Sequence, residues 1–442
     1  FEGDIIANVT TSVILGQDNE VRIFGTGGNI IVESPWFCSG REGGTSRIIV
    51  NRNGQDPDEV VISTDKWIYA IEADHVAENL ENRQGVFPAM TWCDTLGNMR
   101  TCDSWRAAIG QQYEAEKEEN LTTPVYGRPL ERRSDHQMKY ARIDGIDKDI
   151  SRVVMGCDNQ DSLLHGSIMW DDFIELGGNC FDTAYIYGGG QSETLIGKWI
   201  KNRGIRDEVA IICKGAHSPH CFPEKMKEQF AESLERLQTD YVDIYFLHRD
   251  NLDVPVGEFV DVMSEHKDAG QIRIFGGSNW TVERVQEANE YAEKNGKTPF
   301  TALSNNFSLA RMVDAPWGGC LAASDPHSRK WLEEHQMPLF PWSSQARGFF
   351  VPGRSHPDNH SDPELVRCWY SDDNFERQAR AFKMADALGV EPVSIALAYV
   401  LNQPFPTFPL IGPRFLHETT TSFPALGIEL TPEDLKYLNL ED

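Results

Sequence analysis

Residues 179–198 read NCFDTAYIYGGGQSETLIGK, and this stretch decides the fold. An apolar run typical of a buried strand ends at Asp182, a glycine-rich loop follows Tyr187, and a helical pattern begins near residue 192. A strand, a loop and a helix in this order form the repeating unit of α/β proteins. The stretch also poses a chemical question, because a buried strand here ends on a carboxylate and a tyrosine follows five residues later.

The same alternation continues over residues 139–442. Eight strand-like runs follow one another: RVVMG, NCFDTA, VAIICK, VDIYFLH, IRIFGGSN, FTALSN, PLFPWSS and TFPLIG. Helix-like runs separate them, at residues 161–176, 192–202, 223–237, 255–269, 281–294, 325–335 and 374–401. Eight parallel strands with crossover helices predict an α/β fold of the (β/α)8 TIM-barrel type.

Residues 1–118 have a different texture and predict a smaller α+β open-sheet domain in front of the barrel. The segments IIANVTTSVIL, at residues 5–15, and VRIFGTGGNIIVE, at residues 21–33, alternate with period two, and the glycines of the second segment suit a hairpin. Helical spacing follows at residues 67–82 and 94–120. Residues 119–138 contain two prolines and a glycine without any period, so we expect a linker there.

Composition excludes some classes of partner. The chain of 442 residues carries a formal charge of −27, which argues against nucleic acid or an anionic membrane as the main partner. No apolar run approaches the roughly 18 residues of a membrane span. The nine cysteines are an odd number without a CxxC pair, so we expect free thiols and a cytoplasmic location.

Four polar residues define a candidate catalytic site. Asp182, Lys214 and His248 stand at the ends of the second, third and fourth predicted strands, where TIM barrels carry their chemistry, and the loop with Tyr187 can reach the same place. An ammonium beside Tyr187 would lower its pKa, Asp182 would balance that ammonium, and His248 would orient a carbonyl oxygen. Each residue taken alone is more often a cap, a packing residue or a solvated strand end, so the prediction depends on all four converging.

Residues 139–442 resemble the aldo-keto reductases. The resemblance is carried by FDTAYIYGGGQSETLIGK, the lysine of IICKG, SLERLQTDYVDIYFLHRD, GQIRIFGGSNW and LGIELTPED. It implies that Tyr187 is a general acid/base, that Lys214 and Asp182 tune it, and that His248 orients the carbonyl. These groups offer no hydride, so a cofactor must bring it.

The resemblance implies a nicotinamide cofactor, NADP or NAD, held at the ends of the later strands. The implied residues are Ser278, Asn279, Ser304, Trp342, Ser343, Gln345, Arg347, Gly412, Arg414 and Glu418. The first two match residues that hold the nicotinamide amide, Ser304 falls where the family often has glutamine, and Trp342 matches a stacking ring. The next three follow the pyrophosphate loop, and the last three match the adenosine end.

The choice between NADP and NAD stays open at the sequence level. Arg414 lies where a basic residue could pair with a ribose 2'-phosphate, whereas Glu418 would repel that phosphate. The family at large favours NADP. The segment from Val351 to Asn374 is rich in proline, glycine, aspartate and histidine, and we expect it to form a lid or wall over the site.

Residues 1–118 resemble the C-terminal α/β domain of the Gfo/Idh/MocA sugar and cyclitol dehydrogenases. The matching stretches are VRIFGTGGNIIVE, WIYAIEADHVAENLEN, PAMTWCDTLGNM and SWRAAIGQQYEAEK. That family's Rossmann domain and catalytic lysine are not in this sequence, so two interpretations remain: an association or scaffolding sheet, or the surviving half of a longer fusion. The resemblance hints at a sugar or polyol substrate for the whole chain.

Together these features predict an NAD(P)(H)-dependent oxidoreductase that reduces a small carbonyl or oxidises the alcohol, with no metal. The alternative is a redox sensor or scaffold with a non-catalytic barrel. A homo-oligomer through the N-terminal sheet is also expected. His217, His220 and Cys221 lack a further metal ligand at a recognisable spacing, so they are expected to line the substrate pocket instead.

Overall fold

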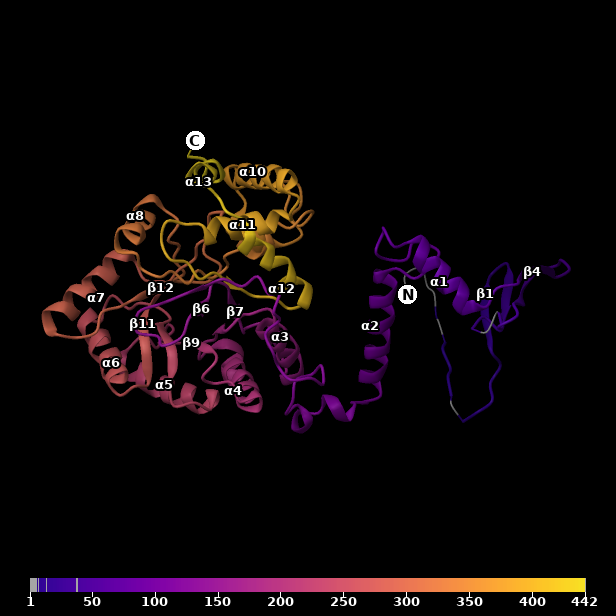
Figure 1. Cartoon of the computed structure of the whole chain (residues 1–442), viewed down its shortest axis with the longest axis horizontal. Coiled ribbons are helices and arrows are strands. Elements are labelled where there is room, and N and C mark those ends of the chain that lie inside the picture. The colour runs from indigo at the N-terminus through magenta and orange to yellow at the C-terminus, as the bar shows by residue number, and fades with distance from the viewer. Residues whose placement is uncertain (1–5, 7, 13, 37–38, 442) are drawn as a thin grey trace. The chain divides into compact units, whose positions relative to one another are not determined.

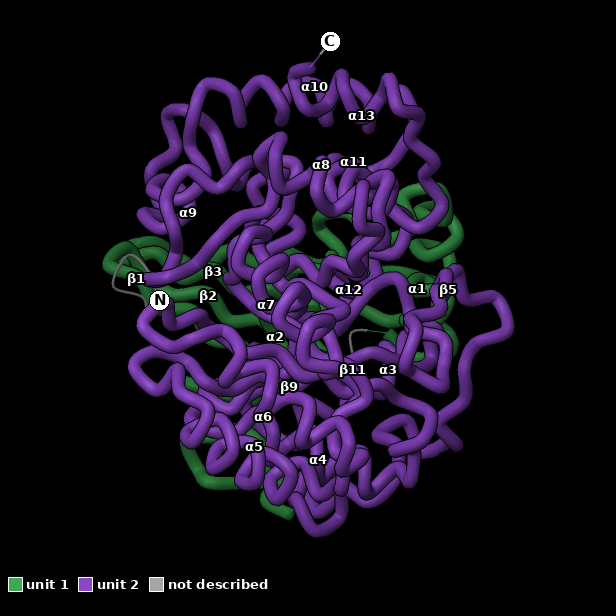
Figure 2. Tube along the Cα trace, turned by 90° about the vertical axis from the view of Figure 1, so that its left-hand side faces the viewer, with its two compact units in different colours: residues 1–112 green, residues 113–442 purple. Residues whose placement is uncertain are grey.

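The structure is a computed structural model, and it describes residues 6, 8–12, 14–36 and 39–441. The chain divides into two compact units, Phe1–Gln112 and Tyr113–Asp442 (Figure 2). The division falls between Gln112 and Tyr113, six residues before the predicted boundary at residue 118.

The first unit contains a four-stranded antiparallel sheet. Its strands are β1 (Glu20–Gly25), β2 (Gly28–Glu33), β3 (Gly44–Arg52) and β4 (Asp58–Thr64), in the order β1-β2-β3-β4. Gly25 pairs with Gly28 across the predicted hairpin, which is confirmed. Only glycine fits at residue 28, because its φ is +145° and a Cβ atom there would lie 1.9 Å from the carbonyl oxygen of Asn51.

Two helices follow the sheet, α1 (Ile68–Glu78) and α2 (Trp92–Ala108), and neither contains a buried residue. The helical run predicted over residues 94–120 ends earlier, because Gly110 turns the chain with a φ of +66°. Two short 3-10 turns replace its second half. The strand predicted over residues 5–15 is wrong in its described part, since residues 6, 8–12, 14 and 15 pair with no strand; residues 5, 7 and 13 lie outside the described residues.

The second unit is a curled parallel sheet that fits the predicted (β/α)8 barrel. Seven strands run in the spatial order β12-β11-β10-β9-β8-β7-β13. Their bounds are β7 (Val154–Gly156), β8 (Cys180–Asp182), β9 (Ala210–Gly215), β10 (Val242–Leu247), β11 (Ile272–Ser278), β12 (Ala302–Ser304) and β13 (Leu410–Ile411). The predicted strand PLFPWSS, at residues 338–344, does not form a continuous strand. Its residue Leu339 forms single parallel bridges with Leu303 and with Thr407, and these bridges join β12 to the segment before β13.

Helices lie outside this ring of strands (Figure 1). They are α3 (Leu163–Glu175), α4 (Gln191–Arg203), α5 (Pro223–Leu237), α6 (Val256–Asp268), α7 (Val282–Asn295), α8 (Pro326–His335), α9 (Pro363–Trp369), α10 (Asp372–Leu388), α11 (Pro392–Leu401), α12 (Leu416–Ser422) and α13 (Pro432–Asn439). The single helix predicted over residues 374–401 is wrong. Gly389 ends α10 with a φ of +67° and Pro392 begins α11, so the run is two helices.

Among the described helices, none is by itself long and apolar enough to cross a membrane. Only α10 and α11 together reach that length and composition, and they are bent by 102°.

Alternate residues of each strand face two different cores. In β10, Ile244 and Phe246 join the cluster inside the barrel, whereas Tyr245 and Leu247 join the cluster between sheet and helices. This period of two is what a strand buried on both faces requires. The barrel is therefore filled with side chains, and ligands can reach it only from the ends.

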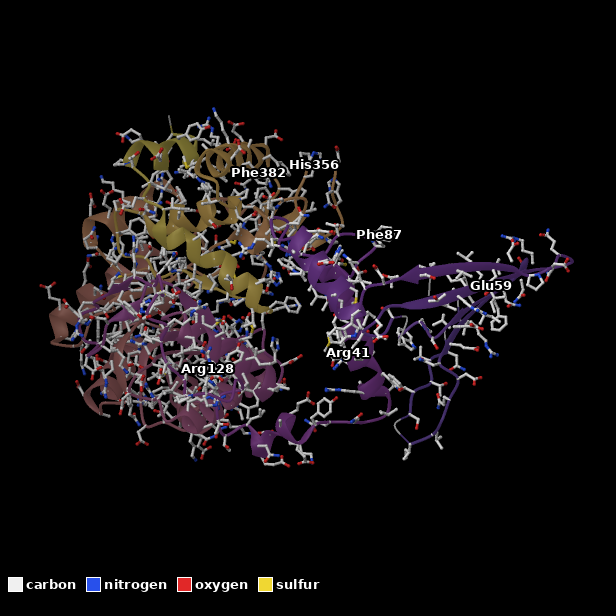
Figure 3. The ribbon with its side chains drawn as sticks, turned by 45° about the vertical axis from the view of Figure 1, so that its right-hand side comes forward. Arg41, Glu59, Phe87, Arg128, His356 and Phe382 are labelled. Atoms are coloured by element: carbon white, nitrogen blue, oxygen red, sulfur yellow. The ribbon has the colours of Figure 1, made fainter. Side chains whose placement is uncertain are left out.

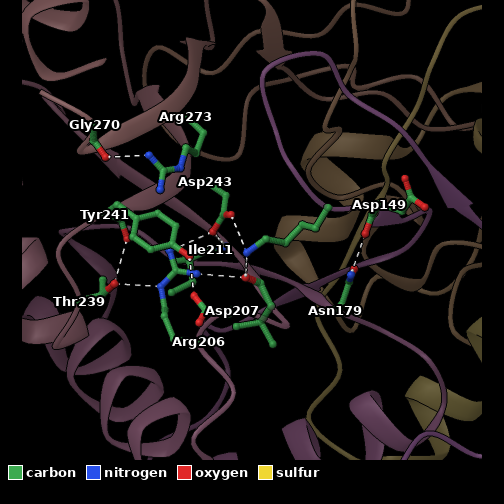
Figure 4. A network of polar contacts seen from close by, with 12 residues as sticks. Asp149, Asn179, Arg206, Asp207, Ile211, Thr239, Tyr241, Asp243, Gly270 and Arg273 are labelled. Atoms are coloured by element: carbon green, nitrogen blue, oxygen red, sulfur yellow. Dashed lines mark hydrogen bonds and ion pairs between the residues drawn. The ribbon is translucent and has the colours of Figure 1, made fainter. Parts of the chain in front are cut away.

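A polar network lies at the amino ends of the strands (Figure 4). Asp243 is fully buried in β10 and forms ion pairs with Lys148 at 3.0 Å and Arg206 at 3.0 Å. It also accepts a hydrogen bond of 2.9 Å from the backbone N–H of Ile211 in the neighbouring strand. This carboxylate links two strands and two cations at one end of the barrel.

The segment predicted as a linker, residues 119–138, lies within the second unit and contacts the barrel's helices. Leu121 is buried in the outer core, and its carbonyl accepts a hydrogen bond of 2.9 Å from Asn202. Arg128, labelled in Figure 3, forms an ion pair of 2.6 Å with Glu175 at the end of α3. These contacts attach the segment to α3 and α4.

Candidate active site

The structure brings three of the four predicted catalytic side chains into direct contact. The Nζ atom of Lys214 in β9 donates hydrogen bonds to the Oδ2 atom of Asp182 at 2.6 Å and to the hydroxyl of Tyr187 at 3.1 Å. Asp182 is the last residue of β8, which pairs with β9 in parallel. All three side chains therefore meet at the carboxyl ends of neighbouring strands.

Three glycines place Tyr187 over this end of the barrel. Gly188, Gly189 and Gly190 have φ angles of +56°, +65° and +94°, which turn the chain from a short 3-10 helix (η3, Tyr187–Gly190) into α4. A Cβ atom at residue 190 would lie 2.5 Å from the guanidinium of Arg236. The glycine-rich loop is thus the means by which a residue beyond the strand folds back onto the strand end.

His248 completes the group from the end of β10. Its ring centroid lies 5.9 Å from that of Tyr187 at an interplanar angle of 82°. Burial, helped by the positive charges of Lys214 and Arg249, holds the pKa of His248 well below its ordinary value. The imidazole is therefore neutral at pH 7 and can donate one hydrogen bond to a carbonyl oxygen.

The pKa of Tyr187 is raised, whereas the sequence analysis predicts that the ammonium of Lys214 lowers it. Burial raises the pKa of this phenol to about 12, and the nearby ammonium of Lys214 offsets only part of that increase. Burial likewise raises the pKa of Asp182 to about 6 in spite of the Lys214 ammonium. Burial by itself would lower the pKa of Lys214. The charge and hydrogen-bond interactions of its ammonium with Asp182 and Tyr187 raise the pKa by more, so the net shift is upward. Tyr187 is consequently held protonated as a proton donor.

The residues expected at the nicotinamide amide lie on adjacent strands. The hydroxyl of Ser278 donates to the carbonyl of Ser304 at 2.8 Å, and the hydroxyl of Ser304 donates to the carbonyl of Phe340 at 2.9 Å. Asn279 has a φ of +59° and accepts a hydrogen bond of 3.1 Å from the backbone N–H of Leu321. Backbone partners thus fix all three side chains close to the mouth.

The segment after Phe340 carries the next group of expected cofactor residues. Trp342 is half-buried, and its Nε1 atom has no partner within the described residues. Ser343 and Arg347 have positive φ angles of 48° and 52°, so the chain turns tightly here. Gln345 donates to Ser422 at 3.1 Å. An aromatic face with an unused donor beside a tight turn fits a flat ring with attached phosphates.

The expected adenosine end lies between β13 and α12. The carboxylate of Glu418 accepts hydrogen bonds from the backbone N–H groups of Arg414 at 2.6 Å and Phe415 at 3.2 Å. The guanidinium of Arg414 donates to Asn159 at 3.2 Å, and Asn159 donates to the carbonyl of Gly412 at 2.9 Å. Glu418 thus caps the helix, while Arg414 stays exposed.

A pocket of about 500 Å³ adjoins these elements and contains residues that the sequence analysis did not single out. It is lined by Asp158, Asn159, Gln160, Asp161, His165, Gly188, Gln191, Ser192, Arg414 and Phe415. The charge of Asp158 contributes to the raised pKa of both Tyr187 and Asp182. The position of Asp158, two residues past the end of β7, is the sequence feature that could have identified it as a site residue.

A second pocket, of about 580 Å³, is lined by none of the predicted catalytic residues.

Within the described residues, no group of three or more His, Cys, Asp or Glu side chains is arranged to hold a metal ion. His217 instead lies with its ring centroid 4.9 Å from that of His248, at the mouth of the barrel. Cys221 is buried, and its thiol contacts the carbonyl of Ala216 at 3.0 Å.

Known proteins resemble this chain mainly over the barrel. A probable aryl-alcohol dehydrogenase of Saccharomyces cerevisiae is 29% identical over 288 residues, which are 61% of this chain and 84% of that protein. A norsolorinic acid reductase of Aspergillus flavus is 29% identical over 301 residues, 65% of this chain and 73% of that protein.

A solved structure gives a likeness of fold alone. The crystal structure of a thermostable aldo-keto reductase with the inhibitor epalrestat aligns with this chain at a TM-score of 0.54 and 21% sequence identity. The alignment covers 69% of this chain and 100% of the reductase chain. A Gfo/Idh/MocA domain over residues 1–118 is not shown by these comparisons and stays a prediction. A model of the Aldo/keto reductase family matches residues 168–440. The chain therefore belongs to the Aldo/keto reductase family.

Proposed function

We propose that the barrel is an NAD(P)(H)-dependent carbonyl reductase, or alcohol dehydrogenase in the reverse direction, with Tyr187 as its general acid/base. Membership of the family makes the chain an oxidoreductase. One observation carries the rest: the Lys214 ammonium lies 2.6 Å from Asp182 and 3.1 Å from the Tyr187 hydroxyl at the carboxyl ends of the strands.

The proton step follows from the charges around Tyr187. A carbonyl that accepts a hydride develops negative charge on its oxygen, and that oxygen needs a proton. The Tyr187 hydroxyl supplies the proton, and the resulting phenolate is stabilised by the Lys214 ammonium 3.1 Å away. Asp182 keeps that ammonium in place, and the neutral imidazole of His248 hydrogen-bonds the carbonyl oxygen. The reverse reaction uses the same groups in the opposite order.

A nicotinamide cofactor, when bound, supplies or accepts the hydride. Trp342 would lie against its ring, Ser278 and Asn279 would meet its amide, and the turn at residues 343–347 would follow its phosphates. NADP(H) is the cofactor that the family generally uses. Arg414, which is exposed, would hold a 2'-phosphate, since the carboxylate of Glu418 is occupied by the backbone N–H groups at the start of α12.

The names of the relatives and two tryptophan side chains both favour an aromatic substrate. The relatives named aryl-alcohol dehydrogenases favour an aromatic alcohol or aldehyde, and the indole rings of Trp317 and Trp342, 6.3 Å apart, offer aromatic walls for it. A sugar or polyol substrate follows only from the resemblance of residues 1–118 and stays a prediction. We therefore propose a small aromatic aldehyde as the first substrate to test.

Binding and turnover should be measured separately. Tryptophan fluorescence of the full chain is titrated with NADPH and with NADH, and reduction of benzaldehyde and of an aldose is then followed by loss of the reduced cofactor. We expect saturable quenching and turnover of the aromatic aldehyde. Binding without turnover of any carbonyl would favour the sensor alternative, and no saturable binding of either cofactor would overturn the proposed function.

A further inference from the structure

The buried guanidinium of Arg249 has only neutral partners among the described residues. Arg249 follows His248 directly and is 4% exposed. Its Nε atom donates to the carbonyl of Gly318 at 3.3 Å, its Nη1 atom to the carbonyl of His248 at 2.8 Å, and its Nη2 atom to the thiol of Cys320 at 3.3 Å. An arginine side chain is always charged, so this site holds a buried positive charge.

No carboxylate in the described part of the chain forms an ion pair with Arg249. The nearest candidate in sequence, Asp250, pairs instead with Arg284 at 3.2 Å, and Asp182 pairs with Lys214. Buried charges in proteins are ordinarily paired, because an unpaired charge is costly to remove from water. The barrel mouth therefore carries one positive charge that the described side chains leave uncompensated.

This charge lies beside the reactive groups. Burial lowers the pKa of both His248 and His217, and the charge of Arg249 adds to this effect. The ring centroids of the two histidines are 4.9 Å apart. Gly319 packs directly on the guanidinium arm, since a Cβ atom at residue 319 would lie 3.3 Å from the Cδ atom of Arg249. Gly319 lies in the turn of residues 317–319, where its φ is +74° and Trp317 is half-exposed.

We propose that Arg249 determines substrate specificity by binding a carboxylate of the substrate, so that the preferred substrates are carbonyl compounds that also carry a carboxylate. The proposal rests on the proposed function. The carboxylate replaces the Cys320 thiol at the Nη2 atom, while the bonds to the carbonyls of His248 and Gly318 remain.

The exchange of partners is favourable for a chemical reason. A thiol is a weak acceptor, whereas a carboxylate forms a shorter, charge-assisted hydrogen bond with a guanidinium. A purely structural role, in which Arg249 only fixes the turn at Gly318, is served by the two carbonyl bonds and needs no positive charge. The charge is thus the feature that a ligand would use.

The test compares two aldehydes of similar size that differ in charge. These are para-carboxybenzaldehyde and its methyl ester, and kcat/KM is measured with each for the wild type, Arg249→Gln and Arg249→Lys. We expect the wild type to prefer the acid by about tenfold or more, as a charged hydrogen bond allows. Arg249→Gln should bring the ratio close to one, and Arg249→Lys should keep part of the preference.

Arg367→Gln is the matched control. Arg367 donates to the carbonyls of Ala315 and Pro316 before the same turn, but its charge is paired with Asp314 at 2.5 Å. This variant should keep the acid-to-ester ratio of the wild type. A wild-type ratio near or below one, or a ratio that Arg249→Gln leaves unchanged, would overturn the proposal while the proposed function stands.

A binding measurement separates failure of this proposal from failure of the proposed function. Calorimetric titration of the wild type with benzoate and with benzyl alcohol needs no turnover, and Arg249→Lys replaces Arg249→Gln if the latter does not fold. We expect benzoate to bind the wild type more tightly than benzyl alcohol does, and more tightly than it binds Arg249→Lys. If neither aldehyde is reduced, the proposed function fails, and equal binding of benzoate and benzyl alcohol would then overturn the carboxylate site as well.

Discussion

The two ends of the barrel use the same residue types in opposite ways. At the amino ends of the strands, Asp243 is surrounded by two cations and a backbone N–H group. At the carboxyl ends, Asp182 has one cation, Lys214, on its Oδ2 atom, and its Oδ1 atom accepts no hydrogen bond in the described part of the chain. Both carboxylates are almost completely buried.

The difference indicates a stabilising role for the amino ends and a binding or catalytic role for the carboxyl ends. An aspartate with several partners holds strands together, and substitutions there are expected to act on stability. At the other end the charges are left incompletely compensated, as the raised pKa of Asp182, near 6, and the neutral partners of Arg249 show. Such groups remain available to a ligand or a reacting atom.

The largest expected effect tests the chemistry at the carboxyl end. Tyr187→Phe removes the hydroxyl that donates the proton, so turnover should fall by about 10²-fold to 10⁴-fold, the usual worth of a placed acid. Cofactor affinity, measured by tryptophan quenching, and the melting temperature serve as controls and should change little. Turnover within tenfold of the wild type would remove Tyr187 from its proposed role.

The next effect tests the structural end. Asp243→Asn leaves Lys148 and Arg206 without their shared carboxylate, so the free energy of unfolding should fall by about 3–5 kcal/mol. Urea denaturation measures this loss, and the protein that remains folded should keep its turnover.

Asp182→Asn is the matched variant at the other end, and it should lose turnover with a smaller loss of stability. The reason is that its raised pKa already makes the ionised form costly at pH 7. Equal destabilisation by both variants, with turnover retained in both, would erase the contrast between the two ends.

The pH dependence of the two reaction directions sharpens the assignment of Tyr187. Because burial raises its pKa to about 12, the hydroxyl stays protonated through pH 9 and reduction should be nearly independent of this group from pH 7 to pH 9. Alcohol oxidation needs the phenolate, whose fraction rises about tenfold per pH unit below the pKa. Steady-state rates in both directions measure this. An oxidation rate that stays flat over that range would contradict the assignment.

The smallest effect concerns a carboxylate outside both ends. Burial, and then the charge of Glu175, raises the pKa of Asp172 in α3 to about 6, above its ordinary 3.8. The ionised form therefore costs stability above pH 6, and this cost disappears as the pH falls from 6 through 3.8.

Asp172→Asn should therefore stabilise the chain at pH 8 by about 1 kcal/mol after allowance for solvent screening, and by almost nothing below pH 4. Melting temperatures of both proteins across this range provide the measurement. A gain that is the same at pH 8 and pH 4 would show that the charge of Asp172 is not responsible.

Much of the barrel was predictable because its signals are local. Apolar runs gave the strands in the right order, and the helical runs predicted at residues 223–237 and 325–335 are the helices Pro223–Leu237 and Pro326–His335. The break between α10 and α11 also had local signals, Gly389 and Pro392, which the continuous helical period outweighed. The strand predicted at residues 5–15 failed in its described part because a period of two says nothing about whether a partner strand is present.

The sequence by itself determined the order of strands and helices, and it placed Asp182, Lys214 and His248 at strand ends, because neighbours along the chain set periodicity and caps. Only the tertiary structure decided the direction of the pKa of Tyr187, because burial is the sum of contacts from distant strands and loops. It alone showed that Asp250 pairs with Arg284 and leaves the charge of Arg249 uncompensated. Charge pairing depends on distances across the fold, and such distances are absent from a linear pattern.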